Sequence, residues 1–201
     1  MSIITISRGS YSRGVEIAEM VAERLGFRCL ARDILIEASK EFNIPEVKLI
    51  QALEDPPSFF ERFTNEKKKY IAYIQTALIN NFRADNIVYH GLAGHFFVKD
   101  IPHVLKVRII ADLEYRIKFA MGRDKIGRDK AIDFLKKIDS SRREWGQHLY
   151  GLNLEDPIHY DIVFNTETLS SEVVADSICK MVTWKKFQTT PASQKKMDNH
   201  A

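Results

Sequence analysis

Residues 3–18 read IITISRGSYSRGVEIA, and this stretch decides the fold. It begins with a β-branched run typical of a buried strand, and from Gly14 onward apolar residues recur at helical spacing. A loop bounded by Gly9 and Gly14 joins the two segments. A strand, a loop and a helix in this order direct backbone N–H groups and the positive end of the helix dipole at one anion. The stretch therefore predicts a phosphate-binding loop in an α/β protein.

The side chains of this loop leave two interpretations open. Gly9 and Gly14 have the spacing of a Walker motif, in which Lys and then Ser or Thr follow the second glycine. Val15 and Glu16 stand at those two positions here. Either the backbone forms a phosphate cradle whose missing charge comes from Arg8 or Arg13, or the segment is an ordinary strand-to-helix turn with two glycines.

Further short apolar runs alternate with helical patterns along the chain. Strands are expected at 27–31, 86–91, 103–111 and 161–166, and helices at 14–25, 33–42, 59–81, from 45, from 112 and from 170 or 171 to about 184. Such alternation predicts a parallel sheet with crossover helices. Ligands then bind beyond the carboxyl ends of the strands, where the loops after Ile6, Ala31, Tyr89 and Ile110 meet.

Composition and charge limit the classes of partner. The 201 residues suit one domain, and the net charge of +3 comes entirely from residues 185–201, whose composition predicts a disordered tail. The remaining chain is neutral, so nucleic-acid binding is not expected. No apolar run is long enough to span a membrane, no signal peptide is visible, and two cysteines suit a reducing cytoplasm. The oligomeric state is open, although the apolar face of the 59–81 helix suggests a homodimer interface.

The segment 112–145 stands apart because it holds ten Lys or Arg residues against seven Asp or Glu residues and only a thin apolar stripe. Arg116 and Arg123 share one helix face, and Asp139 and Arg142 share another. A phosphoryl-transfer enzyme needs fixed guanidinium groups on a hinged segment that excludes water. A solvated helical pair joined by surface ion pairs explains the same composition. No Cys or His pair has metal-ligand spacing, so no metal site formed by side chains is predicted.

Several motifs together resemble the cytidylate kinase-like family of P-loop nucleoside monophosphate kinases. They are Ile6-Ser7-Arg8 with Gly14 and Glu16-Ile17-Ala18; Ala31-Arg32-Asp33-Ile34-Leu35; Gly91; Leu113-Glu114-Tyr115-Arg116-Ile117; Lys137-Ile138-Asp139 with Arg142-Arg143; and Tyr150-Gly151 with Asp156-Pro157 and Tyr160-Asp161. The resemblance covers about residues 1–183. It implies a three-layer P-loop NTPase fold with a five-stranded parallel sheet, a single domain over 1–184, a helical nucleotide-monophosphate-binding insert near 33–85 and a lid within about 122–150.

The resemblance also implies roles for individual residues. The donor phosphates are expected at Arg8, Gly9, Ser10, Tyr11, Ser12, Arg13 and Gly14. The acceptor nucleotide is expected near Arg32, Asp33 and Gly91. The catalytic set is expected to be Arg13, Arg116, Arg123, Asp139, Arg142 and Arg143, with Asp139 orienting one of the arginines. The implied cofactors are ATP and the Mg²⁺ bound with it, to which Glu16 would contribute through water.

This chain departs from the family pattern at the loop itself. Members usually show Ser-Arg-x-x-Gly-Ser-Gly-Gly-Arg-Glu, whereas Tyr11 and Arg13 replace the inner glycines and Val15 replaces the basic residue. Leu92 stands where members often have Arg after the third strand. Two functions are therefore carried forward. The first is transfer of the ATP γ-phosphoryl group to a nucleoside monophosphate such as CMP. The second is a catalytically inactive relative that binds a nucleotide or another anion and acts as a regulatory protein.

Overall fold

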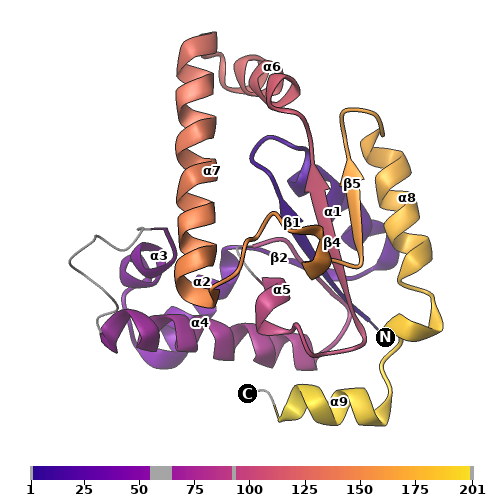
Figure 1. The fold of residues 1–201 in the computed structure, drawn as a ribbon. Coiled ribbons are helices and arrows are strands. Elements are labelled where there is room, and N and C mark those ends of the chain that lie inside the picture. Colours follow the sequence, from indigo (N-terminus) through magenta and orange to yellow (C-terminus); the bar gives the residue numbers. More distant parts are fainter. Residues whose placement is uncertain (1, 55–64, 92–93, 200–201) are drawn as a thin grey trace.

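The computed structural model describes residues 2–54, 65–91 and 94–199, and its centre is a five-stranded parallel sheet (Figure 1). The strands are β1 (Ile3–Arg8), β2 (Arg28–Leu30), β3 (Ile87–Tyr89), β4 (Val104–Ile110) and β5 (Ile162–Asn165). Their order is β2-β3-β1-β4-β5. Because β1 lies between β3 and β4, the chain reverses its direction of winding at β1, and the carboxyl end of this strand is a switch point suited to a ligand.

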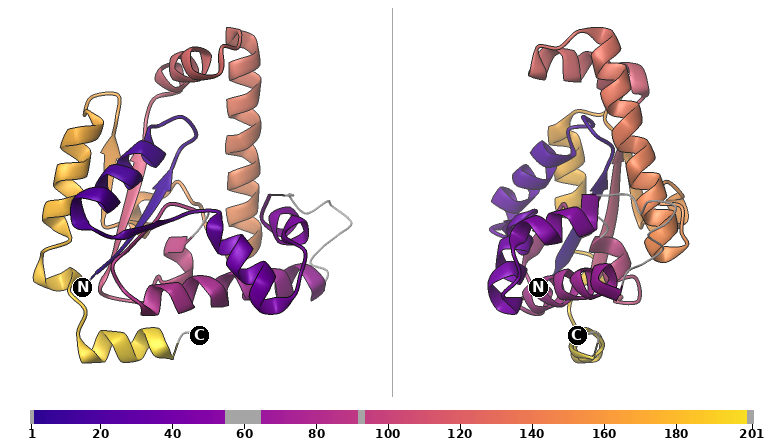
Figure 2. Two further views of the ribbon diagram at one scale, coloured as in Figure 1. Left: turned by 180° about the vertical axis from the view of Figure 1, so that it is seen from behind. Right: turned by 90° about the vertical axis from the view of Figure 1, so that its left-hand side faces the viewer.

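One face of the sheet is covered by α1 (Gly14–Leu25) and α8 (Ser171–Met181), as the two views in Figure 2 show. Ile4 and Ile6 of β1 point to this face and pack with the apolar stripe of α1. Gly26 ends α1 in the left-handed conformation, and the Ser170 side chain caps α8 by accepting from the Val173 N–H, as expected.

The other face is covered by α2 (Asp33–Phe42), α3 (Glu46–Glu54), α4 (Asn65–Arg83) and the short α5 (Gly94–Phe97). The first of these helices starts at Asp33, as the sequence predicts, whereas α5 was not expected. Residues 59–64 of the expected 59–81 helix lie outside the described residues. Ile74, Ala77 and Leu78 of α4 are buried in the protein's own core, so this apolar face is not available for the expected dimer interface.

A helical hairpin formed by α6 (Leu113–Asp124) and α7 (Arg128–Tyr150) extends beyond the carboxyl end of the sheet (Figures 1 and 2). Asp112 caps α6 by accepting from the Glu114 N–H at 2.7 Å, as expected. Among the residues of the hairpin that the structure describes, the apolar cluster between the two helices has four fully buried members, which are Ile117, Ala120, Ala131 and Leu135. The hairpin therefore has little core of its own.

The prediction of a disordered tail is wrong for residues 185–198. This segment forms η2 (Lys185–Phe187) and α9 (Pro191–Asp198). Thr190 and Ser193 form a capping box at the start of α9, and Phe187 and Met197 are buried in the core. The polar composition of residues 185–201 gave no indication of these two buried side chains. A further short helix, η1 (Pro157–His159), precedes β5. Among the described residues no helix combines the length and apolar character needed to cross a membrane.

Candidate functional site

A cavity of about 750 Å³ lies at the carboxyl end of the sheet, between the strand ends, α2 and α7. Ser7, Arg8 and Gly9 form part of its wall, and Ile34, Leu35 and Ile50 form an apolar side. Its lining is strongly basic. The basic side chains that line it are Arg8, Arg32, Arg108, Arg116, Lys137, Arg142 and Arg143. The acidic side chains are Asp139 and Glu155. Such a lining suits a ligand with several negative charges.

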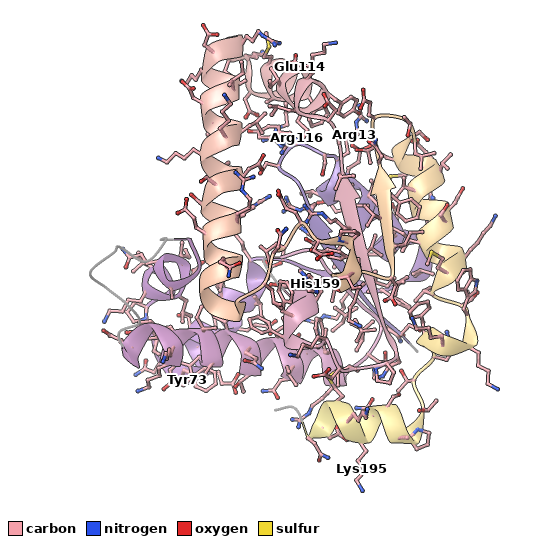
Figure 3. All side chains as sticks on the ribbon, viewed as in Figure 1. Arg13, Tyr73, Glu114, Arg116, His159 and Lys195 are labelled. Carbon is pink, nitrogen blue, oxygen red and sulfur yellow. The ribbon has the colours of Figure 1, made fainter. Side chains whose placement is uncertain are left out.

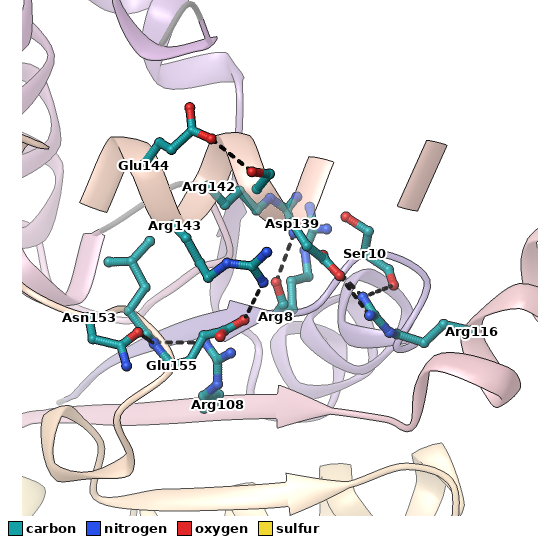
Figure 4. Close-up of polar contacts among 12 residues, drawn as sticks. Arg8, Ser10, Arg108, Arg116, Asp139, Arg142, Arg143, Glu144, Asn153 and Glu155 are labelled. Carbon is teal, nitrogen blue, oxygen red and sulfur yellow. Dashed lines mark hydrogen bonds and ion pairs between the residues drawn. The ribbon is translucent and has the colours of Figure 1, made fainter. Parts of the chain in front are cut away.

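Arg116 and Asp139 form a two-point ion pair within this wall (Figure 4). Arg116 donates to the two carboxylate oxygens of Asp139 at 3.1 and 2.7 Å, and it also donates to the Ser10 carbonyl at 3.4 Å. Only 11% of the Arg116 side chain is exposed. Its guanidinium is therefore fixed in orientation between α7 and the phosphate loop, as predicted for a residue that Asp139 orients.

Arg8 and Arg142 meet on the same wall. Arg142 donates to the Arg8 carbonyl at 3.0 Å. Burial, reinforced by the nearby charges of Arg142 and Arg32, lowers the pKa of Arg8 to about 10. Burial likewise lowers the pKa of Arg142, and the charge of Arg116 acts in the same direction. Buried cations crowded in this way favour an anion between them.

The inner residues of the loop keep a glycine-like backbone although they carry side chains. Tyr11 has φ 61° and Arg13 has φ 57°, both in the left-handed region. The Arg13 side chain is directed at α6, where its Nε donates to the Tyr115 hydroxyl at 2.9 Å and its guanidinium lies over the Phe119 ring. Figure 3 shows Arg13 and Arg116 at the same end of the sheet. Arg13 is not one of the described residues that line the cavity.

The comparisons with known proteins agree with this arrangement. The model of the cytidylate kinase-like family matches residues 3–168. The chain belongs to the cytidylate kinase-like family. It is 26% identical over 187 residues to the cytidylate kinase of Sulfolobus acidocaldarius, covering 92% of this chain and 97% of that protein. It is 27% identical over 190 residues to the cytidylate kinase of Archaeoglobus fulgidus, again covering 92% and 97%.

Solved structures with little sequence similarity share the fold of this family member. An uncharacterized protein from Eubacterium ventriosum superposes with a TM-score of 0.69 at 18% identity, covering 90% of this chain and 98% of that one. A shikimate kinase from Bacteroides thetaiotaomicron gives a TM-score of 0.54 at 10% identity, with 91% and 99% covered. The predicted fold, a five-stranded parallel sheet flanked by helices as in P-loop kinases, is confirmed.

The other residues expected at the site of this family member lie in three environments. Arg32 lines the cavity, whereas Asp33 is exposed at the start of α2. Arg143 lines the cavity and forms an ion pair with Glu155 at 3.6 Å, with half of its side chain exposed. Arg123 lies outside the lining, 4.3 Å above the ring of Tyr11. Their roles in catalysis and binding remain predictions.

Glycines and serines shape the loop itself. A Cβ on Gly14 would lie 2.6 Å from Cβ of Arg8, so Gly14 allows the Arg8 side chain to cross the start of α1. A Cβ on Gly91 would lie 2.2 Å from the Tyr89 hydroxyl, so Gly91 leaves room for the Tyr89 side chain. Ser12 donates to the Gly9 carbonyl at 2.8 Å and closes the loop. Among the described residues, the buried Ser10 hydroxyl has no hydrogen-bond partner.

The structure also adds a group that sequence reasoning missed. Arg108 of β4 lines the cavity and donates to the Leu154 carbonyl at 2.9 Å, with its guanidinium over the Tyr160 ring. The Tyr160 hydroxyl donates to the Leu154 carbonyl at 2.7 Å and forms a second hydrogen bond with the Ser7 hydroxyl, 3.1 Å away, as its acceptor. The His95 ring lies 4.8 Å from the Tyr160 ring and is tilted by 36° to it, and burial lowers the pKa of His95 to about 3, so it is neutral at pH 7. A basic residue inside a β-branched strand was the only available signal for Arg108.

Proposed function

We propose that this protein transfers the γ-phosphoryl group of ATP to a nucleoside monophosphate, with CMP as the first acceptor to test. The observation that carries the proposal is the fixed Arg116–Asp139 pair, which lies next to the phosphate loop and beside Arg8 and Arg142. A solvated helical pair does not require a guanidinium buried this deeply. The membership of the cytidylate kinase-like family supports the same reaction class.

The residues present fit two phosphorylated substrates. The cavity has the apolar wall of Ile34, Leu35 and Ile50 on the side of Arg32, and this wall suits the base and ribose of an acceptor. Arg32, which lines the cavity, would bind the acceptor phosphate, and the N–H groups of the first turn of α1, which have no intrahelical partners, would bind the donor. In the transfer, an acceptor phosphate oxygen attacks the γ-phosphorus, and the bond to the β–γ bridging oxygen breaks and releases ADP.

Arg116 and Arg142 perform the main electrostatic task in this proposal. Negative charge spreads over the transferred group in the transition state, and guanidinium groups that are already oriented stabilise it without reorganisation. Asp139 keeps Arg116 in position through both of its N–H bonds. Because α7 contributes Asp139 and Arg142 from one helix, the hairpin sets both groups at once.

The divalent cation would accompany the nucleotide and depend little on protein ligands. Asp139 and Glu155, the carboxylates that line the cavity, are each paired with an arginine. No group of three or more candidate metal ligands exists among the described residues. Glu16, at the start of α1 and 3.6 Å from Arg13, is the carboxylate that would contact a hydrated ion. Mg²⁺ bound in this way neutralises phosphate charge. We place this reaction in the cytoplasm, where nucleotides are available.

The experiment is a phosphoryl-transfer assay on the full chain with Mg²⁺, ATP and a panel of CMP, dCMP, UMP, AMP and GMP. Formation of ADP together with the acceptor diphosphate, strongest with one pyrimidine nucleotide, is the expected result. The Arg116→Met variant serves as the background control, since contaminating kinases would survive that change. Absence of transfer to every acceptor would reject the proposal.

A second candidate function has its own observation. Val15 supplies no charge, and the side chains of Tyr11 and Arg13 contact the α6–α7 hairpin instead of the cavity. A loop of this kind suits a protein that binds a nucleotide and signals through the hairpin without transferring a phosphoryl group. Isothermal calorimetry with the same nucleotides distinguishes the two functions. Binding without turnover supports the second candidate, whereas turnover that Arg116→Met abolishes supports the first.

A further inference from the structure

The two unusual backbone positions of the phosphate loop require an explanation. A left-handed conformation is disfavoured for a residue that carries a side chain, because Cβ lies too close to the following carbonyl oxygen. Tyr11 and Arg13 adopt it at φ 61° and 57°, where glycine would have no such cost. Residues in such conformations persist when surrounding contacts favour them. The contacts of both side chains therefore show what maintains this conformation.

Tyr11 contacts both helices of the hairpin. Its ring packs edge-on against Phe119 of α6, with centroids 6.4 Å apart, and against Phe134 of α7, at 6.1 Å. Its hydroxyl donates to the Asp124 carboxylate at the end of α6. The Arg123 guanidinium lies 4.3 Å above the ring and also donates to Asp124 at 2.8 Å. Tyr11 thus joins the phosphate loop to the turn between the two helices.

Arg13 makes a parallel set of contacts one turn earlier on α6. Its Nε donates to the Tyr115 hydroxyl at 2.9 Å, and its guanidinium carbon lies 5.0 Å from the centre of the Phe119 ring. Phe119 therefore contacts both loop side chains. We call these contacts of Tyr11 and Arg13 with Tyr115, Phe119, Asp124 and Phe134 the loop–hairpin contact.

The hairpin depends on this contact because its internal core is small. Four buried apolar residues lie between α6 and α7, and Tyr11 is one of the partly buried side chains that complete the cluster. Two hydrogen bonds from hairpin side chains to main-chain carbonyls of the loop act in the same direction, from Arg116 to the Ser10 carbonyl and from Arg142 to the Arg8 carbonyl. The phosphate loop and the hairpin are thus connected by both side chains and backbone.

We propose that Tyr11 is a positioning residue that, together with Arg13, fixes the α6–α7 hairpin on the phosphate loop before a nucleotide binds. Tyr11 and Arg13 thereby place Arg116 and Arg142 over the cavity without help from a ligand. The placement of the hairpin follows from the contacts above alone. Its kinetic consequence rests on the proposed phosphoryl transfer.

Hydrogen–deuterium exchange of the full chain without nucleotide tests the placement. Tyr11→Gly removes every contact of the ring while suiting φ 61°, and Tyr11→Asn removes the ring with a residue that also tolerates this backbone. In both variants the amides of residues 113–135 are expected to exchange at least about tenfold faster, because two aromatic contacts, a cation–π contact and a hydrogen bond are lost. Amides of β1 and β4 are expected to exchange at the wild-type rate.

Tyr11→Phe is the matched control, since it keeps the ring and loses only the bond to Asp124. It is expected to retain most of the protection of residues 113–135. Unchanged exchange in Tyr11→Gly and Tyr11→Asn would overturn the proposal. Equally faster exchange in β1 and β4 would also overturn it, because Tyr11 would then stabilise the whole domain and not the hairpin.

The kinetic test uses the same variants. In Tyr11→Gly, kcat is expected to fall about tenfold with a smaller change in the KM for ATP, because the transition-state arginines lose their preset position while the loop backbone still binds phosphate. Tyr11→Phe is expected to lower kcat less than Tyr11→Gly does, because it keeps the ring contacts with Phe119 and Phe134. If the wild-type protein transfers no phosphoryl group, the proposed function fails, whereas the exchange experiment still decides the placement. A raised KM with unchanged kcat would show that Tyr11 acts in ATP binding and would reject the positioning role.

Discussion

The α6–α7 hairpin, which forms one wall of the cavity, and the phosphate loop direct their arginine side chains differently. On the wall, Arg116 and Arg142 point at the cavity and donate to carbonyls of the loop. On the loop, Arg13 points away from the cavity and is held by Tyr115 and Phe119. Apart from Arg8 at its start, the loop thus contributes backbone and shape, and the hairpin contributes charge.

Under the proposed function, this difference accounts for phosphate binding by a chain that lacks the two basic side chains of the family pattern. The Walker lysine provides a point charge from the loop, whereas an arginine provides a planar group with fixed N–H directions from the hairpin. Neutralisation of phosphate charge then depends on hairpin placement. Four substitutions test whether the hairpin supplies charge and the loop supplies shape. They are given from the largest expected effect to the smallest.

Arg116→Met should have the largest effect. It removes the oriented guanidinium and leaves Asp139 unpaired at only 18% exposure. Loss of an arginine that stabilises the transferred group should lower kcat by about 10³-fold in the phosphoryl-transfer assay. Arg128→Met on the same hairpin is the matched control, because its pair with Glu114 is about half exposed. That control should change kcat by less than about twofold. A similar loss in both variants would place the effect in hairpin folding.

Arg142→Gln should lower kcat/KM by about 10- to 100-fold, because each charge-assisted hydrogen bond to the transferred phosphate contributes roughly 1.5–3 kcal/mol. Arg142 is partly buried, and burial lowers its pKa, so the phosphate should gain more from it than from an exposed cation. Arg143→Gln, whose side chain is half exposed and already paired with Glu155, should have a smaller effect. Equal kcat/KM values for these two variants in steady-state kinetics would contradict the role of Arg142 in the transfer.

Much of this arrangement could be predicted from sequence, because it follows local patterns. The five-stranded parallel sheet, the helix caps at Asp112 and Ser170 and the residues Arg116 and Asp139 all depend on periodicity or on family motifs with fixed spacing. The direction of Arg13 could not be predicted. It depends on Tyr115 and Phe119, about a hundred positions away, and no local pattern encodes that contact. The α9 helix was missed because two buried residues, Phe187 and Met197, outweigh a polar composition.

Gly14→Ala should reduce the free energy of unfolding by about 1–3 kcal/mol, because the new Cβ would lie 2.6 Å from Cβ of Arg8 and force that side chain to move. Gly122→Ala is the control. It lies in α6 with nothing within 4 Å of an added Cβ and has no positive φ, so it should raise stability by about 0.5–1 kcal/mol. Urea unfolding of both variants measures the difference. If Gly14→Ala were as stable as Gly122→Ala, Arg8 would not be packed across the start of α1.

Arg13→Ala should have the smallest effect on catalysis, and it decides between two roles for the loop. If Arg13 replaces the Walker lysine, its loss should lower kcat by about 10² or more. Because its guanidinium lies over Phe119 and bonds Tyr115, we expect a decrease of only about threefold, which corresponds to one exposed cation–π contact. The same variant should nevertheless speed amide exchange in α6. A large kcat loss with unchanged exchange would show that Arg13 turns toward the phosphates when ATP binds, and the loop would then supply charge as well as shape.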